Sequence, residues 1–245
     1  MKITAAVVAL ATATVLANTQ DGDQDLWVYT SQWSAQTCLT TFNKSTLCAN
    51  PTEYLKTHFV ASSLVPTYTD GTAQSGMCRY TYGTFLPTNI APVGEKMLQQ
   101  YWPYFGASNV SAMWSSANFD MENTPQYDYT CSSLGQTAYL SSIVNITKSF
   151  RVPSVIAKHI GQSVATADVR RAFRTKGSAD AVLQCDGNNL ARVSTCWAKG
   201  VLKSDDAEPM YFPTKRIKCP QGVAKADSCF GTHVTISKFP STSYL

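Results

Sequence analysis

The chain of 245 residues contains only three histidines, His58, His159 and His233, and they lie far apart in sequence. Imidazole is the side chain best suited to moving protons near neutral pH, because its ordinary pKa is close to the working range. A two-histidine acid–base site would need His58 together with one of the other two. The eight cysteines form no Cys-x-x-Cys pair, so we expect no zinc site, and nothing in the sequence indicates another cofactor.

The N-terminus predicts export. Met1 and Lys2 precede an apolar stretch at 5–16 that is too short to span a membrane. Small or modest side chains before position 18 favour a secretory signal peptide, 1–17, with cleavage near Ala17; a buried N-terminal helix is the alternative. The mature domain is then 18–245. No later stretch is apolar enough to cross a bilayer, so we expect a secreted, extracellular protein and a monomer.

In an exported protein, an even number of cysteines predicts a disulfide framework. Three Asn-x-Ser/Thr motifs agree with secretion, and any glycosylated asparagine must face solvent. The cysteines are Cys38, Cys48, Cys78, Cys131, Cys185, Cys196, Cys219 and Cys229, and the asparagines are Asn43, Asn109 and Asn145.

Residue types and turn signals predict several strands. The stretch 34–50 is expected to be a loop clipped by Cys38 and Cys48, and Pro66 is expected to end a strand that begins near His58. The predicted strands are 26–33, 58–61, 181–184, 190–197 and 234–239.

Three helices are expected among these strands. The first is 95–102, stopped by Pro103. The second begins near Ala138, where apolar residues recur at helical spacing and predict one buried stripe. The third is 169–176, with Thr166 as its N-cap and Gly177 as its end. The mixture predicts one α+β domain, an antiparallel sheet with packed helices. The apolar stripe consists of Tyr139, Ile143, Ile146 and Phe150.

Charge is distributed unevenly. Residues 18–147 hold four basic and nine acidic residues, whereas 148–245 hold fifteen basic and seven acidic ones. The split is compatible with two ordinary solvated faces or with a basic patch that binds an anionic partner. The candidate binding residues are Arg170, Arg171, Arg174, Lys215, Arg216 and Lys218.

Several short patterns occur in a specific order along the chain, and together they resemble the secreted ribonuclease T2 family across about 26–240. The resemblance implies a single α+β domain built around an antiparallel sheet. It also implies the disulfides Cys38–Cys48, Cys78–Cys131, Cys185–Cys229 and Cys196–Cys219. The patterns are Gln32-Trp33 before Cys38, Phe59 to Pro66, Tyr101-Trp102-Pro103, Trp114 before Thr130-Cys131, Cys219-Pro220, and Ile236 to Pro240.

The family cleaves RNA without metal, using imidazoles as acid and base and a nearby Glu and Lys to stabilise phosphoryl charge. Its first motif reads Phe-x-x-His-Gly-Leu-Trp-Pro. Here Phe59, Leu64 and Pro66 keep that frame, but Ser62 stands at the histidine position. His58 precedes the phenylalanine, on the wrong side of the motif.

The family's second motif reads Trp-x-His-Glu-x-x-Lys-His-Gly-Thr-Cys. Only its ends survive, as Trp114 and Thr130-Cys131, and the stretch between them contains no His, Lys or Arg. Three carboxylates there would repel RNA. Counted forward from Trp114, the catalytic positions fall on Ser116, Ala117, Asp120 and Met121; counted back from Cys131, the second histidine position falls on Asp128.

Because hydroxyls cannot relay protons as imidazoles do, the sequence favours a catalytically inactive homologue, a pseudoenzyme that acts by binding. Its ligand would be RNA, a nucleotide, a glycan or an extracellular protein. The alternative is an active endoribonuclease that produces 2′,3′-cyclic phosphate ends by a reduced or unusual mechanism. Whether the chain is an enzyme stays open at this point.

Overall fold

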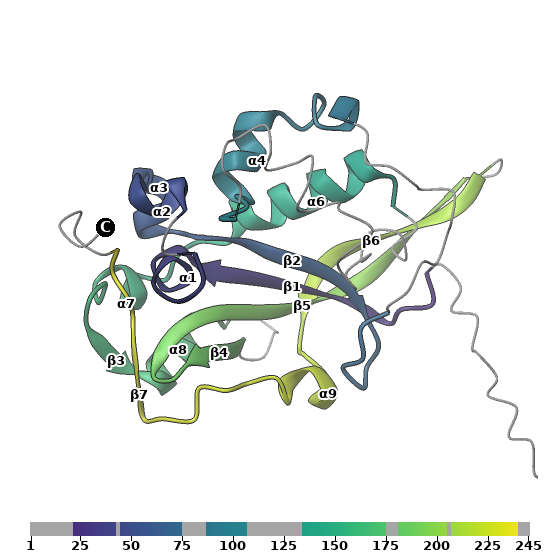
Figure 1. Ribbon diagram of the computed structural model, residues 1–245. Coiled ribbons are helices and arrows are strands. Elements are labelled where there is room, and N and C mark those ends of the chain that lie inside the picture. Colours follow the sequence, from purple (N-terminus) through teal and green to yellow (C-terminus); the bar gives the residue numbers. More distant parts are fainter. Residues whose placement is uncertain are drawn as a thin grey trace, which may run out of the picture.

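The computed structural model describes residues 22–42, 45–74, 87–106, 134–174, 181–204 and 207–239. Strands and helices are mixed in one α+β domain, as the sequence predicts (Figure 1). The strands are β1 (Leu26–Trp33), β2 (Phe59–Thr67), β3 (Ser163–Ala165), β4 (Val182–Asp186), β5 (Asn189–Ser204), β6 (Ala207–Ile217) and β7 (His233–Thr235). The helices are α1 (Ser34–Thr40), α2 (Thr46–Ala49), α3 (Glu53–Thr57), the 3₁₀ helix η2 (Pro87–Asn89), α4 (Glu95–Tyr101), α6 (Gln136–Ser149), α7 (Ser154–Ala157), α8 (Thr166–Ala172) and α9 (Gln221–Ala224).

The described strands form one sheet in the order β2-β1-β5-β7-β3, and β4 and β6 also pair with β5. All of these pairs are antiparallel except the short contact between β5 and β7. Strand β5 is the longest and organises the sheet. Its first half lies between β1 and β4, and its second half pairs with β6.

Helices α4 and α6 cover one face of β1 and β2 (Figure 1). The stripe predicted from Tyr139, Ile143 and Ile146 is buried there, against Trp27 and Leu64. Burying one such side chain contributes about 1.5–3 kcal/mol, so this stripe is what fixes α6 on the sheet.

A buried tyrosine adds a directional contact to that apolar layer. The hydroxyl of Tyr29 donates to Thr147 Oγ1 at 2.9 Å, and Thr147 donates to the carbonyl of Ile143. Burial raises the pKa of Tyr29, so its hydroxyl stays a neutral donor.

Three disulfides lie within the described residues, Cys38–Cys48, Cys185–Cys229 and Cys196–Cys219. They are pairs that the resemblance implies. The fourth pair, Cys78–Cys131, lies outside the described residues.

Several expected boundaries differ from the structure. The expected loop at 34–50 contains α1 and α2, because Cys38 and Cys48 are buried and a helix satisfies the backbone around them. Strand β2 continues through Pro66, which lies on an edge strand where no ladder hydrogen bond needs its nitrogen. Strand β6 was not anticipated from the sequence.

The third helix also differs from expectation. It is α8, Thr166–Ala172, and its N-cap is Ala165 rather than Thr166. The hydroxyl of Thr166 instead donates to the carbonyl of Gly231 at 2.6 Å, which ties α8 to the segment after Cys229. A tertiary hydrogen bond has replaced the local cap.

Within the described residues, no helix is both long and apolar enough to cross a lipid bilayer.

Candidate functional site

Strand β2 carries the first of the two motifs, and Ser62 forms a β-bulge in it. Thr30 of β1 lies opposite Ser63, whereas the next residue, Ser31, lies opposite Ala61, so Ser62 is the extra residue. Bulges are common beside active sites because they redirect a side chain. The resemblance of the sequence places the first-motif histidine at this position, which is a bulge here and carries a hydroxyl.

The outer carbonyls of β2 are capped by neighbouring elements. Trp102 Nε1 donates to the carbonyl of Ser62 at 3.3 Å, and the Tyr139 hydroxyl donates to that of Leu64 at 2.7 Å. The backbone N–H of Gln74 donates to the carbonyl of Pro66. These contacts satisfy an otherwise unpaired strand edge, so the motif frame that survives in the sequence stabilises the edge of the sheet.

The three histidines are held separately. His58 precedes β2 and stacks on Tyr54 with ring centroids 4.2 Å apart. His159 follows α7, with Nδ1 2.7 Å from the Val155 carbonyl, and His233 lies on β7, with Nδ1 3.1 Å from Thr232 Oγ1. Since β2 ends the sheet on one side, and β7 and β3 lie on the other, the fold gives His58 no imidazole partner among the described residues.

Tyr54, on which His58 stacks, has a raised pKa. Burial, and then the neighbouring Tyr101, raise the pKa of Tyr54 to about 12. Tyr54 therefore stays protonated at neutral and acidic pH, and it contributes an aromatic surface rather than a base.

The second motif lies outside the described residues, and so do two of the three sequons. Asn145 is exposed on α6. The residues outside are Ser116, Ala117, Asp120, Asp128, Asn43 and Asn109.

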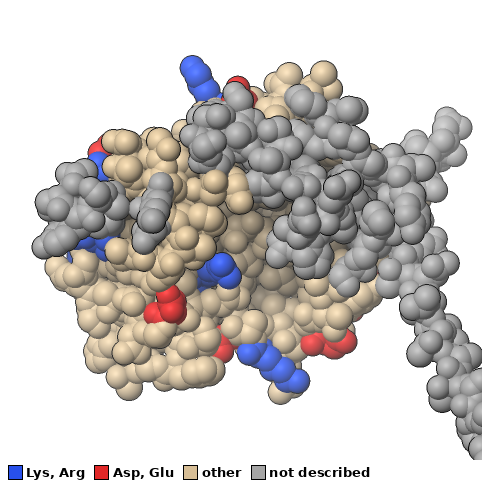
Figure 2. Space-filling model, in the orientation of Figure 1, with Lys and Arg blue, Asp and Glu red and all other residues tan. Residues whose placement is uncertain are grey.

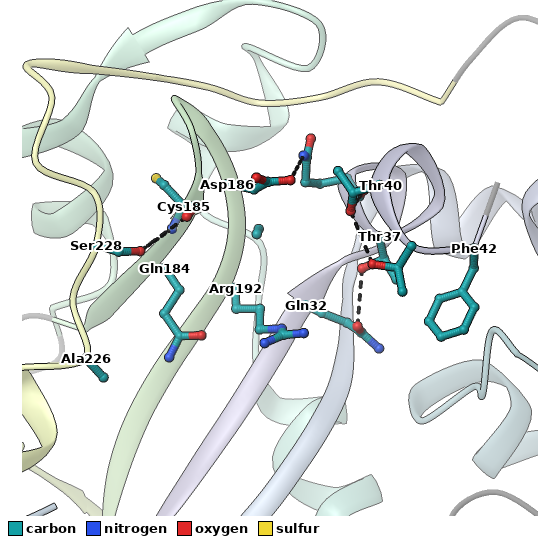
Figure 3. A pocket seen from close by; sticks show the side chains of 13 residues that line it. Gln32, Thr37, Thr40, Phe42, Gln184, Cys185, Asp186, Arg192, Ala226 and Ser228 are labelled. Atoms are coloured by element: carbon teal, nitrogen blue, oxygen red, sulfur yellow. Dashed lines mark hydrogen bonds between the residues drawn. The ribbon is translucent and has the colours of Figure 1, made fainter.

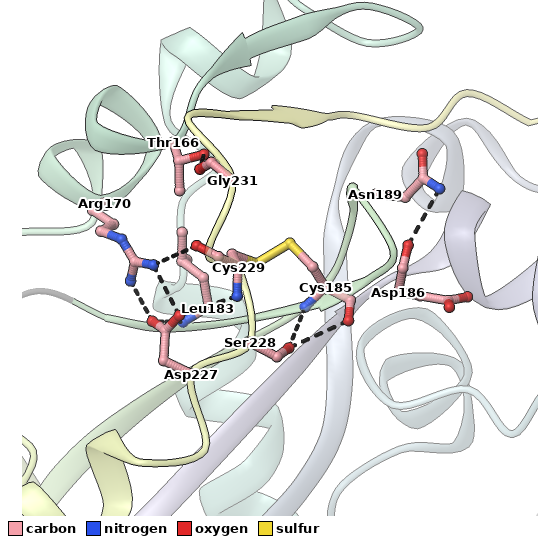
Figure 4. The surroundings of a disulfide bond; sticks show 10 residues. All are labelled: Thr166, Arg170, Leu183, Cys185, Asp186, Asn189, Asp227, Ser228, Cys229 and Gly231. Atoms are coloured by element: carbon pink, nitrogen blue, oxygen red, sulfur yellow. Dashed lines mark hydrogen bonds and ion pairs between the residues drawn. A yellow bond between two sulfur atoms is a disulfide. The ribbon is translucent and has the colours of Figure 1, made fainter.

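Two of the candidate basic residues form ion pairs with carboxylates. Arg170 forms an ion pair with Asp227 through both terminal nitrogens, and it also donates to the carbonyl of Cys229 (Figure 4). Arg171 pairs with Asp168 at 3.1 Å. Arg170 and Asp227 expose only 28% and 19% of their side chains, so this pair belongs to the structure rather than to a docking surface.

The carboxylate of Asp227 is held by several donors. Burial alone raises its pKa, but hydrogen bonds from Arg170 and from the backbone N–H groups of Leu183 and Cys229 outweigh burial and hold the pKa below its ordinary value. Asp227 thus joins α8, β4 and the Cys185–Cys229 disulfide in one network (Figure 4).

The other candidate basic residues lie elsewhere. Lys215 and Arg216 are on β6, which pairs with β5, whereas α8 packs on α7, β3 and β7. Burial lowers the pKa of Arg216. On the face in Figure 2, Lys and Arg side chains are scattered rather than gathered. Lys218 follows β6, and Arg174 follows α8.

A pocket of about 440 Å³ opens between α1, the β4–β5 hairpin and residues 226–228 (Figure 3). Gln32 of β1, Arg192 of β5 and Gln184 of β4 lie opposite one another in the ladder and form one row across it. Thr37 and Phe42 also line the pocket. Its size is in the range of small-molecule sites. Ser62 does not line it.

Sequence reasoning missed this pocket and did not single out Arg192. The signal available was Asp186-Gly187-Asn188-Asn189, a turn in which Gly187 has φ = 57°. Such a turn predicts a hairpin. A hairpin there would have placed Gln184 near Arg192. The sequence could not show that β1 lies beside this hairpin and adds Gln32 to the same row.

Solved structures of similar fold include ribonuclease MC1 from bitter gourd seeds (18% identity, 86% of this chain and 99% of that chain, TM-score 0.56). Others are an RNase-related protein from Calystegia sepium (18%, 89% and 98%, TM-score 0.58) and trichomaglin, an S-like ribonuclease (18%, 89% and 100%, TM-score 0.59). A search of curated proteins found no match. The model of the ribonuclease T2 family matches residues 24–204, and the chain therefore belongs to the ribonuclease T2 family.

Proposed function

We propose that this chain is a secreted ribonuclease T2 homologue that binds RNA or nucleotides without cleaving them. The observation that carries the proposal is the serine at the bulge of β2. Ser62 occupies the position where the family needs a proton-relaying imidazole, and His58 stacks on Tyr54 at the end of the strand instead. Loss of one positioned acid or base lowers a rate by about 10²–10⁴.

Binding of an anionic ligand is supported by relatives of the same fold. Solved complexes of ribonuclease MC1 variants contain 5′-GMP and 5′-UMP, and one of RNase NT contains 5′-AMP. A binding protein needs the fold and a surface, and it does not need both catalytic motifs. A homologue that binds only an extracellular protein would show no RNA binding in the assay described below.

The second candidate is a metal-independent endoribonuclease. It is favoured by the retained Trp102, which caps the Ser62 carbonyl, and by the retained disulfides. Trp102 holds β2 at its bulge, and Cys38–Cys48 lies in the segment that joins β1 to β2.

One assay separates the two candidates. Purified protein is incubated with RNA from pH 4 to pH 8, and 2′,3′-cyclic phosphate ends are measured beside RNA binding by fluorescence anisotropy at increasing salt. We expect binding that weakens with salt and no cyclic ends. Cleavage that persists through stringent purification would establish the enzyme instead.

A serine-to-histidine change sharpens this test. Ser62→His restores only one imidazole, and the second-motif positions contain none. We expect no gain of cleavage, whereas a gain of tenfold or more would mean that a hidden partner completes the site.

Export and modification are parts of the proposal. We expect N-terminal sequencing of the secreted protein to begin near residue 18, and a glycan at Asn145, whose side chain faces solvent. An intact N-terminus would remove the signal peptide from this proposal.

A further inference from the structure

The pocket beside α1 contains an arginine, Arg192, whose guanidinium takes no part in holding the fold together. In the part of the chain that the structure describes, Arg170 and Arg171 are each paired with a carboxylate, but the side chain of Arg192 forms no hydrogen bond or ion pair. A guanidinium is always protonated and presents five N–H donors. Arg192 therefore offers its full set of donors to whatever enters the pocket.

The neighbours of Arg192 leave it as the main charged contact. Gln32 is engaged at both ends of its amide, since Nε2 donates to the Ala61 carbonyl at 3.4 Å and Oε1 accepts from Thr37 at 3.2 Å. Gln184 has only a long contact, 3.5 Å, from Nε2 to Ser194 Oγ, so a second N–H of that amide is open. The side chain of Gln32 is therefore fixed in place, whereas that of Gln184 can turn toward a ligand.

Among the described residues that line the pocket, the one carboxylate is that of Asp186, and it is set apart from Arg192. Asp186 Oδ2 accepts from Gln36 Nε2 at 3.2 Å, at the end of the pocket near α1 (Figure 3). Arg192 lies between Gln32 and Gln184, along the strands. The negative charge of Asp186 is thus anchored to the helix and leaves the guanidinium uncompensated.

The remaining walls suit a polar ring system. The Thr37 and Thr40 hydroxyls and the ring of Phe42 line the same pocket. Phe42 is held by stacking on Phe105 with ring centroids 6.3 Å apart. Hydroxyls and an aromatic edge fit a sugar and a base, and the volume accommodates one such unit.

We propose that this pocket binds a nucleoside monophosphate, with the phosphate on the Arg192 guanidinium and the nucleoside between Phe42 and the threonines. A planar guanidinium matches phosphate oxygens in a two-point contact. The anchor lies on β5, outside both motifs in the sequence, and Ser62 is not among the residues that line the pocket. The assignment rests on the proposed function, because it specifies which nucleotide group the binding protein holds.

Calorimetric titration with uridine 5′-monophosphate, uridine and inorganic phosphate tests the assignment. The wild type is expected to bind the nucleotide at least about tenfold more tightly than either fragment. Arg192→Gln is expected to weaken nucleotide binding by about tenfold or more. Arg192→Lys keeps the positive charge but loses the planar group that can make a two-point contact. Its nucleotide affinity should lie between those of the wild type and Arg192→Gln.

Arg151→Gln is the matched control, because it removes the same charge from an exposed residue between α6 and α7, outside the pocket. It should change nucleotide affinity less than twofold. In parallel, the side-chain ¹⁵N–¹H signals of Arg192 and Gln184 should shift on titration.

Unchanged nucleotide affinity in both Arg192 variants would overturn the site. Uridine that binds as tightly as the nucleotide would overturn the phosphate anchor, and phosphate that binds as tightly would overturn the nucleoside part. RNA anisotropy run beside the titration separates the two proposals. Normal RNA binding by Arg192→Gln, with nucleotide affinity unchanged, refutes only this site, whereas RNA cleavage by the wild type refutes the non-catalytic function.

Discussion

Arg170 contacts one cysteine of the Cys185–Cys229 disulfide, Arg192 lines a pocket with the other, and the surroundings of the two arginines differ. Arg170 donates to Asp227 and to the Cys229 carbonyl in a half-buried network. Arg192 lines a pocket together with Cys185, and no described group pairs with it. One arginine joins three segments of the fold, and the other is left for a ligand. A count of basic residues cannot separate these two roles.

Removing the disulfide should have the largest effect, because both regions depend on it. Cys185→Ala with Cys229→Ala opens a loop of 44 residues and is expected to cost about 4 kcal/mol of unfolding free energy. The pair Cys38→Ala with Cys48→Ala, whose separation is 10, should cost about 3 kcal/mol. Urea unfolding measures both, and an equal or reversed order would contradict the loop-entropy argument.

Breaking the Arg170 network should come next. Asp227→Ala removes the carboxylate that accepts from the Arg170 guanidinium and from the N–H groups of Leu183 and Cys229, and is expected to cost about 3 kcal/mol. Asp168→Ala breaks the exposed pair with Arg171 and should cost less than about 1 kcal/mol. Similar losses in the two variants would mean that the Asp227 network is not a structural one.

The same carboxylate predicts a pH dependence. Because the folded-state pKa of Asp227 is lowered, its contribution is present above the unfolded value of about 4 and is lost as pH falls through the lower folded value. Stability measured from pH 6 to pH 3 should therefore decline at the acid end. In Asp227→Asn this decline should be shallower. If the stability curves of the wild type and the variant are parallel, Asp227 is not a source of the pH dependence.

The smallest effect on stability is expected at the open arginine. Arg192→Ala removes an exposed side chain without a partner, so the unfolding free energy should change by no more than about 0.5 kcal/mol. A loss above about 2 kcal/mol would show that Arg192 is structural, as Arg170 is.

The elements that were predictable are those with strong local signals. The aromatic run in β1 and the stripe of Tyr139, Ile143 and Ile146 identify a strand and a helix because their periodicities are local. Thr166 misled for the opposite reason, since its hydroxyl bonds to Gly231, 65 positions away. Strand β6 contains Pro213 and lacks a clear alternation, so it was missed.

The sequence alone determined that no imidazole stands at position 62, that the cysteines can form a framework, and that the second half of the chain is basic. Only the tertiary structure decided which basic residues are available. Arg170 meets a carboxylate 57 positions away, and Arg192 is placed in one row with Gln32 and Gln184 by three strands. Side-chain pairing depends on distances of a few ångströms, and those distances are set by chain segments that are remote in sequence.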